Sequence, residues 1–501
     1  MKQEPSDTSA QTIISVWHQG MAEAAKNPVL KQQLERQEGK LLPRFAEHYE
    51  QLKSLPRRMR RSLQRHWKRS LAGVALLMVL SQAPAMAATI RVGGACTLGR
   101  AITSANNDAS PRGFCTPGSG ADRIVLSTNS TITLTEVNNE PNYGQIAGPN
   151  GLPVIRSDIT IVGNNSTIRR AANAPEFRIF AVNFDGRLTL RRTTVSNGSL
   201  SILAGSGLVN GGGAVNLTNS TISGNRCSSA VSTTGSSFFT MNNSAISNNS
   251  CGSLFVDRDA SATVTNSTIS GNRSRTSDGS LSSYGGVLVR FGSLTVAEST
   301  ISGNSSLSGG GINSYVNSYA GEITVINSTI SGNTAREDGG GVSHYGGNLT
   351  LINSTISGNS AAGNGGGVFN AVNANLTLAK TLISGNRASR GREVYNSADS
   401  IVISNNFNLF GHSSRAGVRG FTPGPTDIVP NKSLREILNP NLADNGGPTQ
   451  THALVRRSPA IDRVSDGTCP PPQTDQRGVR RPQDGNNNGS AACDIGSFER
   501  R

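Results

Sequence analysis

Between about residues 155 and 410, short apolar stretches alternate with Ser, Thr, Asn and Gly in a pattern that repeats. The hexapeptide S-T-I-S-G-N, or a close variant, occurs eight times, each time with one apolar residue at its centre. These central residues are Val195, Ile222, Ile246, Ile269, Ile301, Ile330, Ile356 and Ile383, at intervals of 23 to 32 residues. A short period repeated this often predicts a solenoid in which each repeat forms one coil.

Two further motifs recur within these repeats. A Gly-Gly-Gly triplet followed by Val, Ile or Ala begins at Gly211, Gly309, Gly339 and Gly365, and a shorter form begins at Gly285. A stretch of the L-T-L type precedes many of the hexapeptides and alternates apolar and polar residues with the period of a strand. No helical periodicity separates the strands. Three short strands per repeat predict an all-β, right-handed parallel β-helix of about nine or ten coils.

Two alternative folds fit the pattern less well. A propeller blade needs about 40–50 residues, which these repeats do not reach. A β-sandwich would not repeat its sequence so literally. In the β-helix, each central Ile is expected to stack on its equivalent about 4.8 Å along the axis.

The Asn that ends each S-G-N is expected to form a ladder of side-chain amides at a turn. A second set of asparagines begins N-S-T strings that match glycosylation sequons: Asn219, Asn266, Asn327 and Asn353. Their fixed position in the repeat favours turn ladders over glycan acceptors, because Asn tolerates the left-handed backbone of sharp turns.

Six cysteines lie beyond residue 87, in a pattern that predicts three disulfides. Cys227 and Cys251 each follow the central Ile of their repeat by five residues, so they are expected to stack as neighbours and to bond. By proximity in the sequence, Cys96–Cys115 would staple an N-terminal cap and Cys469–Cys493 a C-terminal region.

Residues 1–87 differ from everything that follows and predict an extended leader. An amphipathic helix is expected up to Leu55, followed by a basic run from Arg57 to Arg69 and an apolar core at residues 71–80. The A-x-A sequence before residue 88 predicts signal-peptide cleavage after Ala87. An uncleaved anchor and a buried helix are the alternatives, and either Met59 is the true start or residues 1–58 belong to the leader.

The ends of the chain resemble bacterial surface-protein families. Residues 96–106 and 118–126 resemble the CSLREA motif and its continuation, although Gly99 and Arg100 replace the Arg-Glu of that motif. The tail resembles the choice-of-anchor Q region through residues 446–449, 452–454, 458–462, 475–478 and 493–499, and the repeats resemble polymorphic outer-membrane-type β-helix proteins. This resemblance implies a cap with first strands at 88–154, repeats at 155–410 and a choice-of-anchor Q-like region at 411–501.

The same resemblance implies a protein exported to the extracellular space or the bacterial outer-membrane surface, in families largely without assigned catalysis. Relatives often end in a sorting tail, whereas this chain ends at Arg500–Arg501. We therefore expect secretion or non-covalent attachment, and a monomer.

The excess of basic residues indicates which kind of partner the protein could bind. Only 16% of the residues are charged, yet the formal net charge is +15. Residues 88–501 contain 31 Arg but only Lys380 and Lys432 as lysines. Arginine forks match carboxylate and phosphate groups, which makes acidic polysaccharide a candidate partner. Nucleic acid is not expected, because the chain is predicted to be exported and lacks aromatic stacking platforms; a GC-rich coding bias would also explain the arginines.

Acidic residues are few within the repeats and include Asp257, Asp259, Asp278, Glu298, Glu322, Glu337 and Asp338. Polysaccharide lyases and hydrolases need carboxylates that converge on one face. The best available pair is Asp257 and Asp259, whose i, i+2 spacing predicts a shared strand face. Solvated turn acids are the alternative, and His344, His412 and His452 are isolated singles.

The sequence from Asp484 to Gly489 reads D-x-N-x-N-G, like the start of a calcium loop. Asp484, Asn486 and Asn488 would supply oxygen ligands, with Asp494 as a further carboxylate. Ile495 stands where such loops carry glutamate, so any affinity should be weak, and an Asn/Gly turn is the alternative. Calcium is the one cofactor that the sequence suggests.

These patterns favour an exported, non-catalytic surface protein that functions in adhesion or glycan binding. A polysaccharide lyase or glycoside hydrolase acting on acidic polysaccharide is the enzymatic alternative. A purely structural envelope protein is the third.

Overall fold

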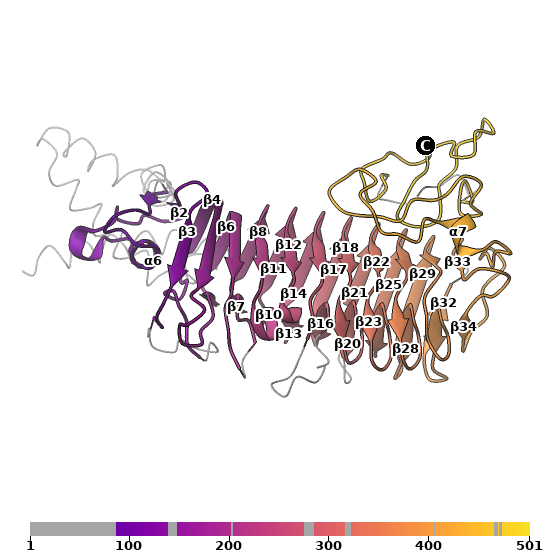
Figure 1. The fold of residues 1–501 in the computed structure, drawn as a ribbon, viewed down its shortest axis with the longest axis horizontal. Coiled ribbons are helices and arrows are strands. Elements are labelled where there is room, and N and C mark those ends of the chain that lie inside the picture. The colour runs from indigo at the N-terminus through magenta and orange to yellow at the C-terminus, as the bar shows by residue number, and fades with distance from the viewer. Residues whose placement is uncertain are drawn as a thin grey trace, which may run out of the picture. The chain divides into compact units, whose positions relative to one another are not determined.

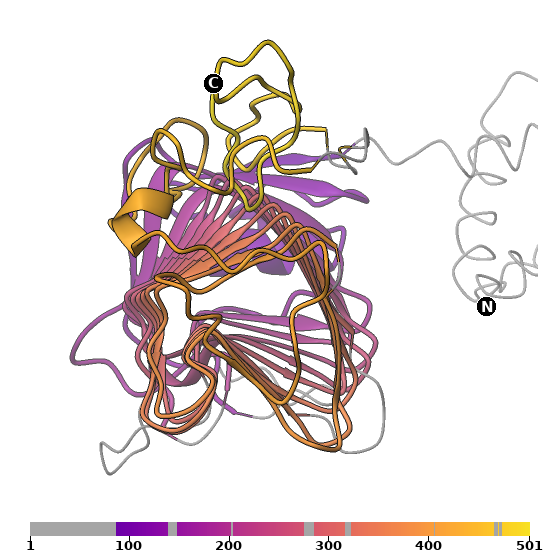
Figure 2. The ribbon, with the colours of Figure 1, turned by 90° about the vertical axis from the view of Figure 1, so that its right-hand side faces the viewer.

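The computed structural model describes residues 87–138, 148–201, 204–274, 285–315, 322–404, 406–464, 469 and 473–501. The predicted leader and its apolar core at 71–80 lie outside these residues. Residues 88–501 form one compact unit. Strands of successive coils superimpose when the unit is viewed along its length (Figures 1 and 2). In the described part of the chain, no helix is long and apolar enough to cross a membrane.

All pairings between the named strands are parallel, which confirms the predicted parallel β-helix. One side of the coil is a ten-stranded sheet. Its strands are β5 (Phe180–Asn183), β7 (Leu208–Gly211), β10 (Arg226–Thr234), β13 (Ser250–Asp257), β16 (Val287–Arg290), β20 (Ile312–Tyr315), β24 (Val342–Tyr345), β28 (Val368–Ala371), β31 (Val394–Asn396) and β34 (Val418–Arg419).

The L-T-L stretches form a second ladder, which we call the L-T-L ladder. Its strands are β8 (Ala214–Thr218), β11 (Phe238–Asn242), β14 (Ser261–Thr265), β17 (Ser293–Ala297), β21 (Glu322–Ile326), β25 (Asn348–Ile352), β29 (Asn375–Ala379) and β32 (Ile401–Ile403).

The hexapeptides form a third ladder, the T-I-S ladder. Its strands are β9 (Thr221–Ser223), β12 (Ala245–Ser247), β15 (Thr268–Ser270), β18 (Thr300–Ser302), β22 (Thr329–Ser331), β26 (Thr355–Ser357), β30 (Leu382–Ile383) and β33 (Leu409–Phe410). Two long strands, β4 (Asp158–Arg170) and β6 (Arg187–Ser196), run through both ladders and join them into one sheet. A small sheet follows the hexapeptides, with β19 (Ser305–Ser306), β23 (Thr334–Ala335) and β27 (Ser360–Ala361).

The register is the one that the repeats predict. Ile301 lies opposite Ile269 on one side and Ile330 on the other. All eight central apolar residues are fully buried, so they form a continuous column inside the coil. The turn asparagines of the N-S-T strings adopt left-handed backbones, with φ between 46° and 49°. The triplet glycines are also required: at Gly309 (φ 61°), an added Cβ would lie 2.5 Å from the carbonyl oxygen of Ile312.

The predicted asparagine ladder is present and buried. Each side-chain Nδ2 donates to the Oδ1 of the next asparagine at 2.8 to 3.0 Å. Each Oδ1 accepts a second bond from the backbone N–H of the preceding ladder residue. The members of this asparagine ladder are Asn225, Asn249, Asn272, Asn304, Asn333, Asn359 and Asn386. The ladder therefore satisfies the polar groups of seven stacked turns inside the protein.

A cap covers the first coil. It contains β1 (Thr89–Arg91), β2 (Asp122–Val125), β3 (Thr131–Leu134), the 3-10 helix η1 (Pro111–Gly113) and the helix α6 (Leu98–Asn106). Helix α6 begins after Thr97, whose side chain accepts from the backbone N–H of Arg100, and it buries Leu98, Ala101 and Ile102. The Arg100 guanidinium lies 4.2 Å from the centre of the Phe114 ring. The disulfide Cys96–Cys115 fastens this cap, as predicted.

The C-terminal region, residues 411–501, begins with β34, which still belongs to the ten-stranded sheet, and its segments around Gln450, Gln476 and Ser497 lie against the outer face of the T-I-S ladder (Figures 1 and 2). It has one short helix, α7 (Leu434–Ile437), and irregular bridges. The Thr329 hydroxyl lies between Gln476 Oε1 at 2.6 Å and Ser497 Oγ at 3.0 Å. Ser331 Oγ lies 2.8 Å from His452 Nε2. These contacts join segments more than 100 residues apart in the sequence.

Candidate functional site

A row of aromatic side chains crosses the outer face of the ten-stranded sheet. Val342, Val368 and Val394 point into the core, so the side chains that follow them alternate outward. Tyr345 and Phe369 have ring centroids 5.4 Å apart, and Phe369 stacks on Tyr395 at the same distance. Tyr315 lies 6.0 Å from Tyr345 at the other end. We call Tyr315, Tyr345, Phe369 and Tyr395 the aromatic stripe.

The stripe combines buried and accessible rings. Phe369 is the buried ring of the stripe, 7% exposed, whereas Tyr315 is 50% exposed. Burial raises the pKa of the Tyr345 phenol, and the nearby charges of Asp338 and Glu337 raise it further, against the lowering effect of a hydrogen bond with Ser343. The phenol therefore stays protonated at neutral pH and keeps its hydrogen for donation.

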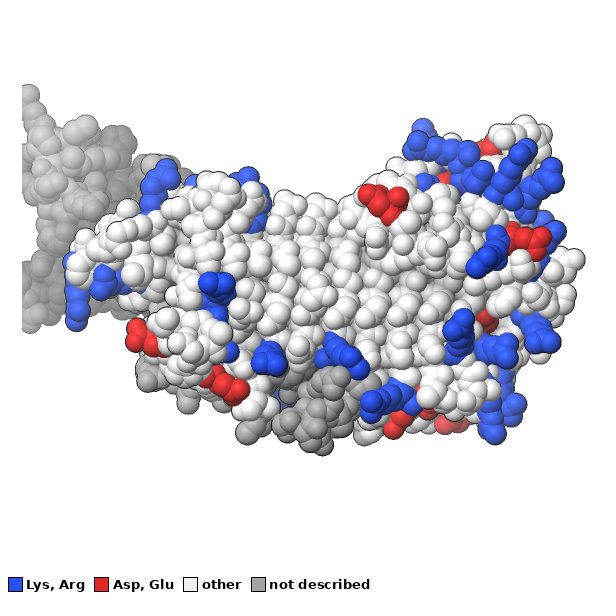
Figure 3. All heavy atoms as spheres, viewed as in Figure 1, with Lys and Arg blue, Asp and Glu red and all other residues white. Residues whose placement is uncertain are grey.

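Exposed arginines gather where the stripe ends. Tyr395 in β31 lies opposite Arg419 in β34. Burial lowers the pKa of the His412 imidazole, and the charges of Arg392 and Arg415 lower it further. The arginine cluster consists of Arg387, Arg390, Arg392, Arg415 and Arg419, all exposed. In the view of Figure 3, basic side chains likewise gather at the end of the solenoid near β34.

None of these five arginines forms an ion pair with a carboxylate among the residues that the structure describes. Arginines elsewhere are often engaged: Arg290 makes a bidentate pair with Asp257, at 2.9 and 2.7 Å. The guanidinium groups of the cluster are thus available to an external anion.

The predicted pairing of Asp257 with Asp259 on one strand face is wrong. Strand β13 ends at Asp257, whose buried carboxylate is bound by Arg290. Asp259 lies beyond the strand in a left-handed turn, with φ 64°, and is exposed. The chain turns between the two residues, so the alternation of a strand no longer applies.

The other repeat acids lie mostly in turns. Glu337 accepts from Ser308 Oγ at 2.9 Å, and Asp338 accepts from the backbone N–H of Asn364 at 2.6 Å. Glu298 takes a left-handed turn position, and Glu322 is the exposed first residue of β21. Asp278 lies outside the described residues. Within the described part of the chain, no three of these acids form a group that could hold a metal ion.

The histidines are separate, as the sequence indicates. Burial lowers the pKa of His344 to about 4, so its ring is neutral at physiological pH. His452 bridges Ser331 and the carbonyl oxygen of Asn439. Among the described residues, no group of three or more His, Cys, Asp or Glu side chains could hold a metal ion.

Side-chain oxygens of the calcium-like loop accept hydrogen bonds within the protein. Asp484 accepts backbone N–H bonds from Asn488 at 3.0 Å and Gly489 at 2.8 Å, which is how an aspartate closes a turn. Asn488 Oδ1 accepts from Ser490, and the backbone N–H of Asn486 bonds to Asp462. The Asp494 carboxylate is buried and accepts from the backbones of Asp462 and Arg500. Calcium binding by Asp484, Asn486, Asn488 and Asp494 thus stays a prediction.

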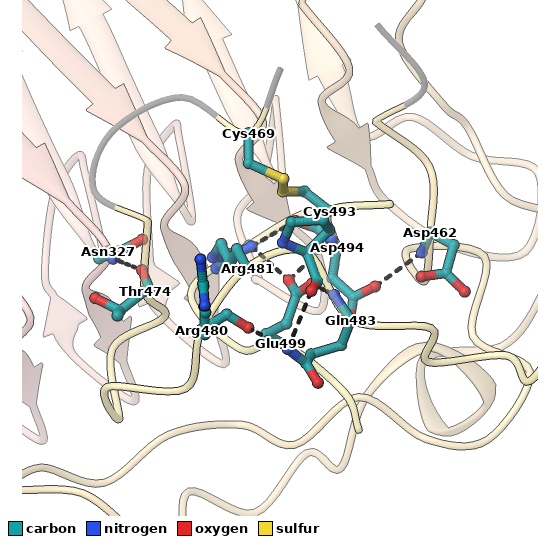
Figure 4. The surroundings of a disulfide bond; sticks show 12 residues. Asn327, Asp462, Cys469, Thr474, Arg480, Arg481, Gln483, Cys493, Asp494 and Glu499 are labelled. Carbon is teal, nitrogen blue, oxygen red and sulfur yellow. Dashed lines mark hydrogen bonds and ion pairs between the residues drawn. A yellow bond between two sulfur atoms is a disulfide. The ribbon is translucent and has the colours of Figure 1, made fainter. Parts of the chain in front are cut away.

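The disulfide Cys469–Cys493 joins the C-terminal region as predicted, with its Cα atoms 5.8 Å apart (Figure 4). Strand pairing places Arg226 opposite Ser250, but the register shifts by one residue between Arg226 and Ser229, so the pairing next to Cys227 and Cys251 is irregular. The side chain of Cys227 lies outside the described part of the structure. The bond between Cys227 and Cys251 therefore stays a prediction.

A buried charge network, which the sequence analysis missed, lies beside Cys493 (Figure 4). Arg481 Nη1 donates to Glu499 Oε2 at 2.9 Å, and its Nη2 donates to the Gly496 carbonyl at 2.6 Å. Burial raises the pKa of Asp494 to about 8, with the charge of Glu499 as a second cause. Arg477 pairs with the buried Asp475 at 2.7 Å. These groups hold the C-terminal loops together without regular secondary structure.

The asparagine ladder ends on a buried glutamate, which the sequence analysis also missed. Glu393 accepts from Asn386 Nδ2 at 2.6 Å and from the backbone N–H groups of Gly385 and Asn386. Burial raises its pKa to about 8, although these hydrogen bonds act in the opposite direction. The repeat pattern does not predict this contact. Glu393 takes the place of the next asparagine of the ladder, but it lies at a different position in its coil.

This glutamate should make stability depend on pH. The pKa of Glu393 is higher in the folded chain than the ordinary value of 4.5 expected after unfolding, so the folded state binds more protons between these values. Stability should therefore fall as pH rises. Between pH 6.5 and 8 the loss should be about 2 kcal/mol. His344 acts in the opposite direction, because its imidazole is neutral when folded but half protonated at pH 6.5 when unfolded, at its ordinary pKa of 6.5.

The measurement is the free energy of unfolding at pH 6.5 and pH 8 for the native chain and the Glu393→Gln variant. Asp494 also titrates in this range but is common to both proteins, so the difference between them isolates Glu393. Equal pH slopes for the two proteins would contradict the prediction.

The chain matches no family model and no curated protein. Among solved structures, it is similar to the crystal structure of pectate lyase Pel9A, with 15% sequence identity and a TM-score of 0.44. The similarity covers 77% of this chain and 92% of that one. The fold assignment above stands on strand register and burial alone.

Proposed function

We propose that this chain is an exported, non-catalytic surface or extracellular protein that binds acidic polysaccharide. The observation that carries the proposal is the aromatic stripe, which runs along the solenoid and ends at Tyr395, opposite Arg419, in the last coils where five arginines are exposed. The two disulfides are compatible with an extracellular location. The resemblance of the chain ends to CSLREA and choice-of-anchor Q proteins supports the same proposal.

The two parts of the site would contribute differently. Aromatic rings offer flat apolar faces against which the C–H faces of sugar rings pack, and tyrosine hydroxyls add hydrogen bonds. Guanidinium forks bind carboxylate or sulfate groups with two parallel hydrogen bonds. The stripe spans three coil steps, or roughly 14 Å at about 4.8 Å per coil, which suits an extended chain.

The enzymatic alternative requires acids that act on the same ligand. Glu337 and Asp338 are the acids whose charges raise the pKa of Tyr345, and both accept hydrogen bonds from neighbouring coils, from Ser308 and Asn364. Non-catalytic binding is therefore the better-supported function. A structural envelope role would show no glycan binding at all.

Calorimetric titration with polygalacturonate, followed by a wider panel of acidic and neutral glycans, tests the proposal. The native chain should bind acidic glycans, and added salt should weaken the binding. The Tyr315→Ala/Tyr395→Ala variant should bind about tenfold more weakly, which corresponds to about 1.4 kcal/mol. Arg392→Gln/Arg419→Gln should also lose affinity and should retain less salt dependence.

Arg123→Gln, at an exposed arginine of β2 near the other end of the molecule, is the matched control and should bind normally. If no acidic glycan in the panel binds, the proposal is wrong. If the native chain shortens the polysaccharide during the titration, the enzymatic alternative is correct.

A further inference from the structure

A second row of uniform side chains runs along the outer face of the L-T-L ladder. Its members, which we call the threonine column, are the central residues of five consecutive strands, β14 to β29. They pair directly in register from one coil to the next. The column consists of Thr263, Thr295, Thr324, Thr350 and Thr377. Each threonine thus repeats the position of its neighbour about 4.8 Å away.

The hydroxyls of this column have no partner within the described residues, unlike other threonines on this surface. Thr240, one coil before the column, donates to Asn216. In the T-I-S ladder, the C-terminal region covers Thr300 and Thr355 and bonds both hydroxyls. The C-terminal region thus buries these threonines of the T-I-S ladder, whereas the threonine column stays partly exposed, with Thr263 the most exposed.

The column is also rigid. Threonine is branched at Cβ, which restricts χ1 in a strand. The backbone beneath it is held by parallel pairing on both sides, and Figure 2 shows the strands of successive coils superimposed. Five hydroxyls and five methyl groups are therefore presented at one fixed spacing.

The surroundings of the column carry little charge. The outward positions on either side of it are Ser261, Ser293, Glu322, Asn348 and Asn375 before the threonines, and Thr265, Ala297, Ile326, Ile352 and Ala379 after them. Glu322 is the one charged residue in this set, and none of the ten is aromatic. A polyanion would find no positive partner here, and a sugar ring would find no ring on which to stack.

We propose that the threonine column binds ice. Hydroxyls at a constant spacing can hold first-layer waters in a repeating array, and methyl groups between them limit other water orientations. A charged surface would impose strongly oriented hydration instead, because ionic groups hold their own water tightly. Rigidity lowers the entropic cost of ordering the layer, since the side chains are already fixed. An uncharged, rigid, periodic hydroxyl array therefore fits an uncharged crystalline lattice of water.

The experiment follows ice growth in the presence of the full chain. The native protein should shape growing crystals and should be enriched in slowly frozen ice relative to a co-dissolved control protein. The Thr324→Lys/Thr350→Lys variant should lose both effects, since its ammonium groups disrupt the array. Thr324→Val/Thr350→Val keeps the methyl groups and removes the hydroxyls, so it should weaken both effects without introducing charge.

Thr422→Lys/Asn441→Lys adds the same charge at exposed positions of the C-terminal region and should behave like the native chain. Unfolding curves establish that all variants fold. If the native chain leaves ice growth unchanged, the proposal is wrong. If the native chain binds insoluble cellulose and has no effect on ice growth, the ligand of the column is an uncharged polysaccharide and the ice proposal is wrong. Binding of acidic glycan at the aromatic stripe is independent of either result.

Discussion

Replacing Arg481 with methionine should destabilise the C-terminal region by about 3–5 kcal/mol. The Arg481 side chain is 1% exposed and its partner Glu499 is fully buried. Methionine fills much of the same space but removes the guanidinium from Glu499, which keeps the backbone N–H bonds from Gln483 and Asp494, and it takes the Arg481 donor from the Gly496 carbonyl. A buried acceptor without a partner, and above all a buried charge, costs more than the lost hydrogen bonds themselves.

Limited proteolysis and denaturant unfolding of the full chain measure this effect. Arg480→Met, at the exposed neighbouring position, is the matched control and should cost less than about 0.5 kcal/mol. The double variant Arg481→Met/Glu499→Leu removes both charges and should recover part of the loss. If Arg481→Met is no more sensitive to protease than Arg480→Met, the network contributes little to holding the C-terminal region together.

Removing one rung of the asparagine ladder should cost about 3 kcal/mol or more. Asn304→Ala removes the Oδ1 that accepts from the backbone N–H and Nδ2 of Asn272, at 3.0 and 2.9 Å. It also removes the donor to the Ile269 carbonyl, at 3.0 Å. All of these groups are buried, so no bulk water can replace the missing side chain.

The free energy of unfolding in guanidinium measures this cost, and hydrogen exchange shows whether the loss stays within the coils next to residue 304. A solenoid coil contacts only its neighbours, so the effect should be local. Asn348→Ala is the control, because Asn348 is exposed and its Oδ1 accepts one bond, from Asn375 at 3.1 Å. Equal costs for the two variants would show that the ladder adds nothing beyond an exposed amide.

The aromatic stripe shows where sequence register stops being informative. Tyr315 is the last residue of β20, whereas Phe369 is the second residue of β28. They occupy different positions in their repeats, so no column in the sequence connects them. They join one stripe because Tyr345 is long enough to reach across the sheet from one position to the other. Side-chain length and direction, which the repeat pattern does not contain, decided this site.

The C-terminal region shows the same limit. Thr221 and Thr329 occupy the same position in their hexapeptides. The Thr329 hydroxyl donates to Gln476 Oε1, whereas Thr221 has no such bond among the described residues. Which coils are covered depends on where residues 411–501 fold back, and that depends on contacts between distant segments. Likewise, the D-x-N-x-N-G pattern does not reveal that the Asp494 carboxylate is buried and accepts from the backbones of Asp462 and Arg500.

The sequence by itself determined the β-helix, its register, its column of central apolar residues and its asparagine ladder. It could do so because a coil stacks only on its neighbours, so the spacing of a repeat fixes which residues meet. Only the tertiary structure decided which threonines are covered, which acids are buried and which aromatic rings touch. Those outcomes depend on the way in which large side chains and distant loops pack around the repeats. The period of the repeats does not encode this packing.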